Sequence, residues 1–231
     1  LARLYPTVGY DLDSGRIAEL QSGHDRTGEI TALELSASSL TVTGAADDIA
    51  DAEIYIVTVP TPVDTNHQPD LRLIEAACAG IGKLLSAGNI VVFESTVYPG
   101  VTEDICGPAL AAASGLVCGM DFFLGYSPER INPGDREHTI DKITKVVAGQ
   151  NDAVLDRLAE LYGKVTTGGV FRAPNIKTAE AAKVIENAQR DINIAFVNEV
   201  AANPTGILSA RPVKQNDARR PDPNLPAFSN S

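Results

Sequence analysis

A carboxylate held between two prolines is the feature of this sequence that most clearly suggests chemistry. Residues 126–135 read Tyr-Ser-Pro-Glu-Arg-Ile-Asn-Pro-Gly-Asp and follow the apolar run Met120–Gly125. Proline fixes its own φ and restricts the residue before it, so Pro128 and Pro133 stiffen the backbone around Glu129. Ligands of open α/β sheets bind just outside the carboxyl ends of the strands, so a rigid acid there predicts a site. A surface turn with a solvated glutamate is the alternative, and these residues alone do not separate the two.

A second polar group lies on a helix expected from Lys177 to Ala202. One face of this helix, which is otherwise rich in Ala, Ile, Val and Phe, carries five polar residues, namely Lys183, Asn187, Arg190, Asp191 and Asn198. Lys183 and Asn187 are four residues apart, so both can reach one small ligand, the lysine as a cation and the asparagine as a neutral donor or acceptor. A solvated helix face is the simpler interpretation. The rigid Glu129 segment upstream favours a site.

An acid near the start of the chain indicates dinucleotide binding. Val8–Asp11 ends a predicted strand, and Arg16 lies in the helix that follows. Asp11 fits the acidic residue that binds the ribose about 20 positions after a glycine-rich phosphate loop. That count passes beyond Leu1, so the loop is expected upstream of this sequence. The internal candidate Gly80–Gly82 lies within a helical pattern and lacks the third glycine, and we reject it.

Short apolar runs alternate with helical stretches along the chain. Strands are expected at 7–11, 40–43, 53–59, 89–94, 120–126 and 143–148, and helices at 13–21, 71–85, 102–113 and 151–161, with Asp13, Asp70, Thr102 and Asn151 as caps. This alternation predicts an α/β fold, a Rossmann-like doubly wound parallel sheet without its first strand, followed by a long connecting helix. We expect a domain at 1–175, the connecting helix at 176–202, and a disordered, proline-rich tail at 203–231.

Composition excludes several classes of protein. The 231 residues carry a formal net charge of -11, with a pI of about 4.7, which argues against nucleic acid or an anionic membrane as a partner. Cys78, Cys106 and Cys118 fit neither a disulfide framework nor a zinc site, so we expect buried thiols, no metal and a reducing compartment. With no export signal or membrane span in the sequence, we expect a cytoplasmic protein.

Five motifs in the same order resemble the nucleotide-sugar 6-dehydrogenases, a family that includes UDP-glucose and GDP-mannose dehydrogenases. They are Val8-Gly9-Tyr10-Asp11, Thr58-Val59-Pro60-Thr61-Pro62, Glu94-Ser95-Thr96-Val97-Tyr98-Pro99-Gly100, the Glu129 loop, and Ala179-Glu180-Ala181-Ala182-Lys183-Val184-Ile185-Glu186-Asn187. The resemblance extends from Leu1 to about Val200. Pro133 stands where the UDP-glucose branch has a second glutamate, which favours the branch acting on UDP-N-acetylhexosamines.

The resemblance implies oxidation of the sugar C6 alcohol to a carboxylate with two NAD, for the synthesis of surface polysaccharide, by a protein that is a homodimer at full length. A cysteine thiolate traps the intermediate aldehyde, and the resulting thioester is hydrolysed. That cysteine lies in a Gly-Gly-x-Cys segment that this sequence does not contain, and none of its three cysteines matches the position. We therefore expect both ends to be truncated and this chain to be inactive alone.

The family's roles carry over to this chain by position. Glu129 is expected as the acid/base of hydrolysis, Lys183 as the oxyanion stabiliser, and Asn187 as the group that holds the substrate hydroxyl or a water. The UDP-sugar would also contact Arg130, Ile131, Asn132 and Pro133. Asp11 and Arg16 would hold the adenosine ribose and the neighbouring phosphate, favouring NAD over NADP. Ser95 and Thr96 would line the nicotinamide side, and the turn passing over the cofactor would contain Thr58, Val59, Pro60, Thr61 and Pro62.

Two alternatives remain open. A β-hydroxyacid dehydrogenase also joins a dinucleotide domain to a helix with Lys-x-x-x-Asn, but has a glycine-rich stretch before the lysine that Ala179–Ala182 lacks. The chain could also be a non-catalytic cofactor-binding remnant. In the predicted topology the first strand, expected upstream of this sequence, is central in a 3-2-1-4 order. Its two neighbours are therefore expected to stand apart with unpaired edges.

Overall fold

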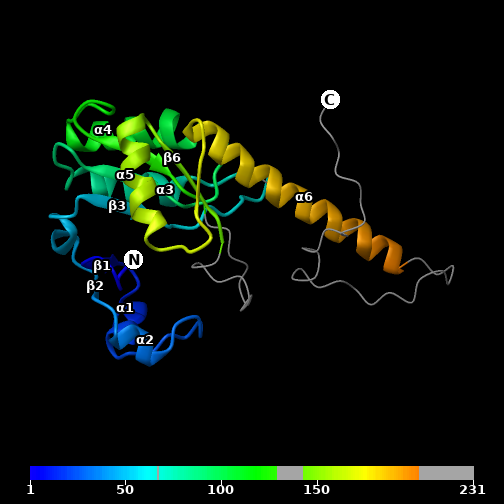
Figure 1. Cartoon of the computed structure of the whole chain (residues 1–231), viewed down its shortest axis with the longest axis horizontal. Helices are drawn as coiled ribbons and strands as arrows, with labels where there is room; N and C mark the ends of the chain where they lie inside the picture. Colours follow the sequence, from blue (N-terminus) through cyan, green and yellow to red (C-terminus); the bar gives the residue numbers. More distant parts are fainter. Residues whose placement is uncertain (67, 129–142, 203–231) are drawn as a thin grey trace. The chain divides into compact units, whose positions relative to one another are not determined.

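The computed structural model describes residues 1–66, 68–128 and 143–202, and Figure 1 traces the chain. The chain divides into two units, Leu1–Ala181 and Ala182–Ser231. The strands of the described residues all belong to the first unit, where they form two separate sheets. The predicted tail at 203–231 lies outside the described residues.

The smaller sheet pairs β1 (Thr7–Tyr10) with β2 (Leu40–Thr43) in parallel, with Thr7 opposite Leu40. Helix α1 (Ser14–Gln21) connects them and is capped by Asp13, whose carboxylate accepts hydrogen bonds from the amides of Gly15 and Arg16. This cap confirms the prediction for Asp13. A short helix, α2 (Ala32–Ser36), was not predicted, although Thr31 and Glu34 form a capping box at its start.

The larger sheet has the order β3-β4-β5-β6-β7. Its strands are β3 (Ile54–Val57), β4 (Ile90–Phe93), β5 (Phe123–Tyr126), β6 (Lys145–Gly149) and β7 (Val170–Arg172). Within the described residues β1 pairs only with β2, and β3 only with β4. This arrangement agrees with the expectation that these two strands do not share a ladder.

Helices cover both faces of the larger sheet (Figure 1). On one side α3 (Arg72–Gly82), the π-helix η2 (Val101–Cys106) and α4 (Gly107–Ser114) pack on a core that includes Val91, Phe93 and Tyr126. On the other side α5 (Asp152–Gly163) packs on Ile90 and Val92. β4 is buried at every position, as expected for a strand covered on both faces.

Besides the unpredicted helix α2, three elements of the first unit differ from the sequence expectation. Strand β6 runs antiparallel to β5, so the sheet is mixed and not wholly parallel. Apolar periodicity reports burial and carries no information about strand direction, which explains this error. Strand β7 and the short 3-10 helix η1 (Ala46–Ile49) were not predicted. Runs this short carry little periodicity.

Of the other three predicted caps, Asn151 is confirmed, whereas Asp70 and Thr102 are wrong. Asn151 caps α5, since its side chain accepts from the amide of Val154. The N-cap of helix α3 is Leu71, which makes no side-chain cap hydrogen bond, and Asp70 instead accepts from the amide and guanidinium of Arg72. Thr102 lies inside η2, whose N-cap is Gly100. The helix expected at 102–113 is thus a π-helical turn continued by α4.

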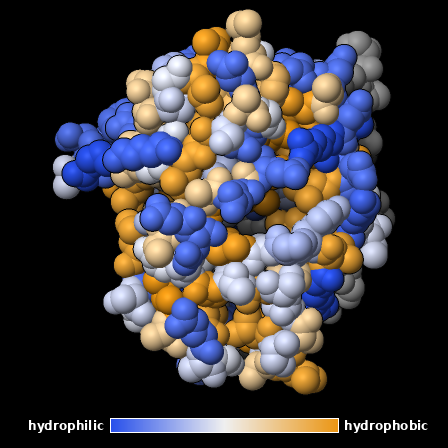
Figure 2. Space-filling view, turned by 90° about the vertical axis from the view of Figure 1, so that its left-hand side faces the viewer, coloured by the Kyte–Doolittle hydropathy of each residue, from blue (hydrophilic) through white to orange (hydrophobic). Residues whose placement is uncertain are grey.

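Helix α6 (Ile176–Ala202) is one continuous helix of 27 residues, close to the predicted bounds (Figure 1). It begins in the first unit and continues into the second. Apolar side chains are exposed on it and elsewhere, and Figure 2 shows apolar residues at the surface among polar ones on the face that it presents. No helix in the described ranges is both long enough and apolar enough to cross a membrane.

Candidate functional site

Two loops at the carboxyl edge of the larger sheet are tied to each other. Residues 58–62 follow β3, and residues 94–100 follow the neighbouring strand β4. The hydroxyl of Ser95 donates to the carbonyl of Val59 at 2.6 Å, and the hydroxyl of Thr61 donates to the carbonyl of Thr96. Parallel neighbours place their carboxyl ends at one edge, so these predicted cofactor residues lie side by side.

Side chains of these two loops differ in burial, and the buried ones hold the loops while the exposed ones can reach a ligand. Ser95 is 6% exposed, with its hydroxyl committed to Val59 and its carbonyl accepting from the Tyr126 hydroxyl at 3.2 Å. Thr96 and Thr58 are exposed. The geometry therefore makes Ser95 a fixing point of the loop, while the side chains of Thr96 and Thr58 are accessible to a ligand.

The start of this loop carries a buried charged cluster that sequence analysis did not identify. Glu94 Oε1 accepts from the hydroxyl of Tyr162 at 2.6 Å and lies 3.4 Å from the ammonium of Lys145. The Lys145 ammonium is also 5.2 Å from the centroid of the Tyr162 ring. The side chains of Lys145 and Glu94 are only 3% and 12% exposed. The available signal was Glu94 itself, a carboxylate at the end of a wholly apolar strand.

Asp11 and Arg16 lie at the carboxyl end of β1. Asp11 is exposed, and its Oδ1 accepts from the amide of Asp13 at 2.9 Å. Arg16 Nη2 donates to Asp25 at 2.7 Å, while its buried Nη1 lies 3.6 Å from Glu19 and makes no hydrogen bond within the described residues. Arg16 is thus anchored by Asp25, and its guanidinium also lies close to the Glu19 carboxylate.

Asp25 is the centre of its own hydrogen-bond network. Its carboxylate accepts from Arg16, from the hydroxyl and amide of Thr27, and from the amides of Glu29 and Ile30. Burial alone would raise the pKa of Asp25, but the hydrogen bonds from Arg16, Thr27 and the backbone outweigh it and hold that pKa well below its usual range. The residue therefore stays ionised and keeps Arg16 in place.

This donor set fits the ribose end of a dinucleotide. Asp11 has an exposed carboxylate whose second oxygen, Oδ2, makes no hydrogen bond in the described part of the chain, so it can accept from a ribose hydroxyl. The Arg16 guanidinium, which Asp25 holds in place, is a cation of the kind that pairs with a phosphate. Among the described residues no hydrogen bond or ion pair links Asp11 or Arg16 to the loops at 58–62 and 94–100.

The predicted polar stripe on α6 forms its own set of contacts in the second unit. The Lys183 ammonium lies 3.8 Å from Glu186, and Arg190 lies 3.9 Å from the same carboxylate. Arg190 also donates to the side-chain oxygen of Asn187 at 3.1 Å. Because the side-chain oxygen of Asn187 accepts from Arg190, the groups that Asn187 can offer a ligand are its amide N–H donors. Glu186, which contacts both Lys183 and Arg190, belongs to this polar group but was not predicted from sequence.

The catalytic and substrate residues predicted in the proline-flanked loop, Glu129, Arg130, Ile131, Asn132 and Pro133, lie outside the described residues. Their roles remain predictions from sequence.

The three cysteines are poor nucleophiles. Cys78 and Cys106 are fully buried, and Cys118 is partly buried. The neighbouring Cys78 thiol and burial both raise the pKa of Cys106, and burial raises that of Cys118. A nucleophilic cysteine needs the opposite shift. Among the described residues, no cluster of three or more His, Cys, Asp or Glu side chains could hold a metal ion.

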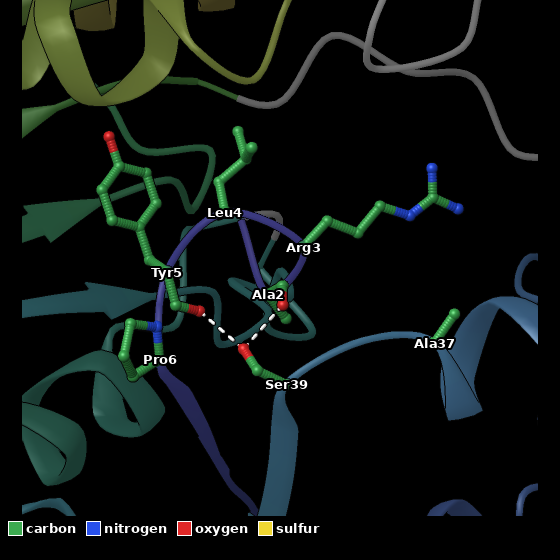
Figure 3. A pocket seen from close by; sticks show the side chains of 7 residues that line it. All are labelled: Ala2, Arg3, Leu4, Tyr5, Pro6, Ala37 and Ser39. Carbon is green, nitrogen blue, oxygen red and sulfur yellow. Dashed lines mark hydrogen bonds between the residues drawn. The ribbon is translucent and has the colours of Figure 1, made fainter.

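A hollow of about 310 Å³ lies at the opposite end of the smaller sheet (Figure 3). Ser39, just before β2, has its hydroxyl 2.6 Å from the carbonyl of Ala2 and 2.8 Å from that of Tyr5, just before β1. These residues stand at the amino ends of the strands, whereas Asp11 follows a carboxyl end. The hollow is therefore not part of the candidate site.

Comparison with known proteins agrees with this geometry. Residues 5–166 match the NAD-binding domain of the UDP-glucose/GDP-mannose dehydrogenase family. The chain is 51% identical over 197 residues to protein CapL of Staphylococcus aureus, and 52% identical over 195 residues to the UDP-N-acetyl-D-glucosamine 6-dehydrogenase of Pseudomonas aeruginosa. These matches cover 85% and 84% of the chain but 46% of each relative, so the chain spans about half their length.

A solved structure gives the same result. The UDP-D-ManNAc dehydrogenase of Pyrococcus horikoshii superposes with a TM-score of 0.79 at 33% identity, covering 86% of this chain and 48% of that one.

Proposed function

The chain belongs to the UDP-glucose/GDP-mannose dehydrogenase family, through the NAD-binding domain of that family, and we propose that it supplies the NAD-binding part of an enzyme that oxidises C6 of a UDP-N-acetylhexosamine. Relatives named UDP-N-acetyl-D-glucosamine 6-dehydrogenase, 52% and 48% identical to this chain, support this choice of sugar. Pro133 in the proline-flanked loop supports it independently.

One observation carries the proposal. The loops after β3 and β4 are joined by hydrogen bonds from Ser95 to Val59 and from Thr61 to Thr96. They form a single rigid platform at the carboxyl edge where α/β sheets bind cofactors, with Thr58 and Thr96 exposed on it. When bound, NAD supplies the hydride acceptor. In this proposal Asp11 and Arg16 orient the ribose end, and the platform orients the nicotinamide end.

The remaining assignments complete the proposal. Lys183 stabilises the oxyanion, Asn187 donates to the substrate hydroxyl or a water through its amide N–H groups, and Glu129 acts as acid/base in the final hydrolysis. The full reaction uses two NAD and yields a uronic acid for polysaccharide synthesis. The protein acts as a cytoplasmic homodimer at full length.

Calorimetric titration of the 231-residue chain tests the cofactor assignment. NAD should bind more tightly than NADP, because the Asp11 carboxylate accepts from a ribose hydroxyl and repels a 2′-phosphate. Replacing Asp11 with Asn should weaken NAD binding about tenfold, the factor for one charge-assisted hydrogen bond. The same change at Asp47, an exposed residue of η1, is the control and should leave binding unchanged. Equal affinity for NAD and NADP would contradict the role of Asp11.

The substrate assignment is tested by the absorbance of reduced nicotinamide. NAD is offered with UDP-N-acetylglucosamine, with UDP-glucose, or with small β-hydroxy acids. Reduction with the acetamido sugar supports the proposal, whereas reduction with hydroxy acids alone supports a β-hydroxyacid dehydrogenase. NAD binding without reduction by any of them would leave this chain as a cofactor-binding module.

A further inference from the structure

A fully buried carboxylate anchors the far end of the cofactor loop. Glu180, in the second turn of α6, has no exposed surface. Its Oε2 accepts from the amide of Gly100 at 2.6 Å, and its Oε1 accepts from the amide of Thr102 at 2.9 Å. Burying a carboxylate costs several kcal/mol of solvation free energy unless polar partners compensate it. The two amides, some 80 residues away in sequence, are those partners.

The amides that Glu180 binds open a helical segment. Gly100 is the N-cap of η2, which runs directly into α4. The first amides of a helix lack partners within that helix and carry partial positive charge, so a carboxylate there satisfies donors and matches the dipole. Glu180 thus performs the capping role that the sequence had assigned to Thr102, and supplies it from a different helix.

The backbone turns at Gly100 in a conformation that favours glycine. Its φ is 101°, in the left-handed region, and a Cβ at this position would come within 2.7 Å of Asp104 Oδ2. The loop that holds Ser95 and Thr96 is therefore fixed at its start by Glu94, with Tyr162 and Lys145, and at its end by Glu180.

We propose that Glu180 is a positioning residue for the cofactor, which holds the end of the loop so that Thr96 keeps the orientation that receives the nicotinamide. This inference rests on the proposed function for the identity of the ligand. Glu180 does not touch the ligand in this proposal, because it is fully buried beneath the Gly100 turn. It acts through the two amides.

A matched control lies beside it. Lys177, one turn earlier on α6, forms an exposed ion pair with Asp104 of η2 at 2.9 Å. This pair joins the same two helices as Glu180 but does not bind the loop backbone. Replacing Glu180 with Gln keeps the side-chain shape, removes the charge, and turns an N–H donor toward one of the amides. Replacing Asp104 with Asn removes an acidic charge from the same helix junction.

Two measurements on the 231-residue chain test the inference. In Glu180→Gln, amide hydrogen exchange at Gly100 and Thr102 should become roughly tenfold faster or more, because a charge-assisted hydrogen bond is lost. In the control Asp104→Asn the exchange rates of these two amides should not change. In calorimetry, Glu180→Gln should weaken NAD about tenfold and leave ADP-ribose, which lacks nicotinamide, unchanged. Glu180→Asp, which retains the charge, should recover part of both losses.

Each outcome decides a separate point. Unchanged exchange at both amides, or equal losses of NAD and ADP-ribose affinity, would overturn the positioning role. If the unsubstituted chain binds neither ligand, the proposed cofactor function of this chain fails, and the exchange data still decide whether Glu180 holds the loop.

Discussion

The buried cluster around Glu94 is expected to dominate the stability of the cofactor platform at the residue scale. Replacing Glu94 with Gln removes the anion beside the buried Lys145 and should cost roughly 3 kcal/mol of unfolding free energy. Tyr162→Phe removes one hydrogen bond to a charge and should cost about 1.5 kcal/mol. The control is Glu53→Gln, which breaks the exposed ion pair with Arg157 and should cost under about 1 kcal/mol of unfolding free energy. If urea unfolding shows that Glu94→Gln costs no more unfolding free energy than this control, the Glu94 cluster does not stabilise the platform.

Asp25 makes stability depend on pH in a defined direction. Its pKa in the folded chain lies well below that of an unfolded aspartate, about 3.9. Its contribution to the free energy of unfolding is therefore complete above the unfolded pKa and is lost as the pH falls through the folded pKa. Asp25→Asn should lower unfolding free energy by roughly 2 kcal/mol at neutral pH, since Arg16 loses its anionic partner. In thermal melts the difference in melting temperature between parent and variant should narrow below about pH 3.9. A difference that widens on acidification would refute this assignment.

The outcomes for single residues show why sequence predicts some site residues and not others. Asp13 and Asn151 were predictable as caps because they bind amides two or three positions away. Glu94 and Glu180 were not, because their partners, Tyr162 and Gly100, are 68 and 80 residues distant. Apolar spacing identifies strands that become buried, whereas pairing between distant polar groups depends on the assembled fold.

At the element scale, two strand edges are open in the described structure. In a parallel ladder the N–H and C=O of one residue point to the same side. Asp11 donates to Thr43, and Ile90 donates to Glu53, so the odd-numbered residues of β1 and β3 face their partner strands. The amides of the even-numbered residues, Val8, Tyr10, Ile54 and Ile56, therefore face away from any paired strand among the described residues.

Hydrogen exchange should alternate along these strands. The amides of Val8, Tyr10, Ile54 and Ile56 should exchange at least about tenfold faster than those of Gly9, Tyr55 and Val57, because only the latter are hydrogen-bonded in a ladder. Strand β4, paired on both sides, is the internal control and should be uniformly protected. Equal protection of the alternate amides would mean that another segment covers these edges.

Strand direction marks the limit of the fold prediction at this scale. The runs at 143–148 and 151–161 were identified as a strand and a helix, as observed in β6 and α5. Their periodicities report which residues become buried. The antiparallel pairing of β6 with β5 has no signature in either run.

At the scale of the whole molecule, α6 presents an apolar stripe that is suited to self-association. Ile185, Ile192 and Phe196 are 65%, 68% and 67% exposed, and their spacing of seven and four residues places them on one side of the helix. Exposed apolar surface of this kind favours association when two copies bury it together. Because the proposed full-length protein is a homodimer, we expect this stripe to lie in the contact between two copies.

Replacing Phe196 with Asp should weaken self-association, because the variant loses a large apolar side chain and places a charge in the contact. Sedimentation velocity over a range of concentrations should show the parent chain as a dimer. In Phe196→Asp the dissociation constant of the dimer should be at least about tenfold higher. Asn198→Asp adds the same charge to the polar stripe of α6 and should leave the dimer intact. NAD affinity should be equal in all three proteins, since Asp11 and the platform loops belong to the first unit. A parent chain that stays monomeric, or a Phe196→Asp dimer of unchanged strength, would remove this stripe from the interface and leave its exposure unexplained.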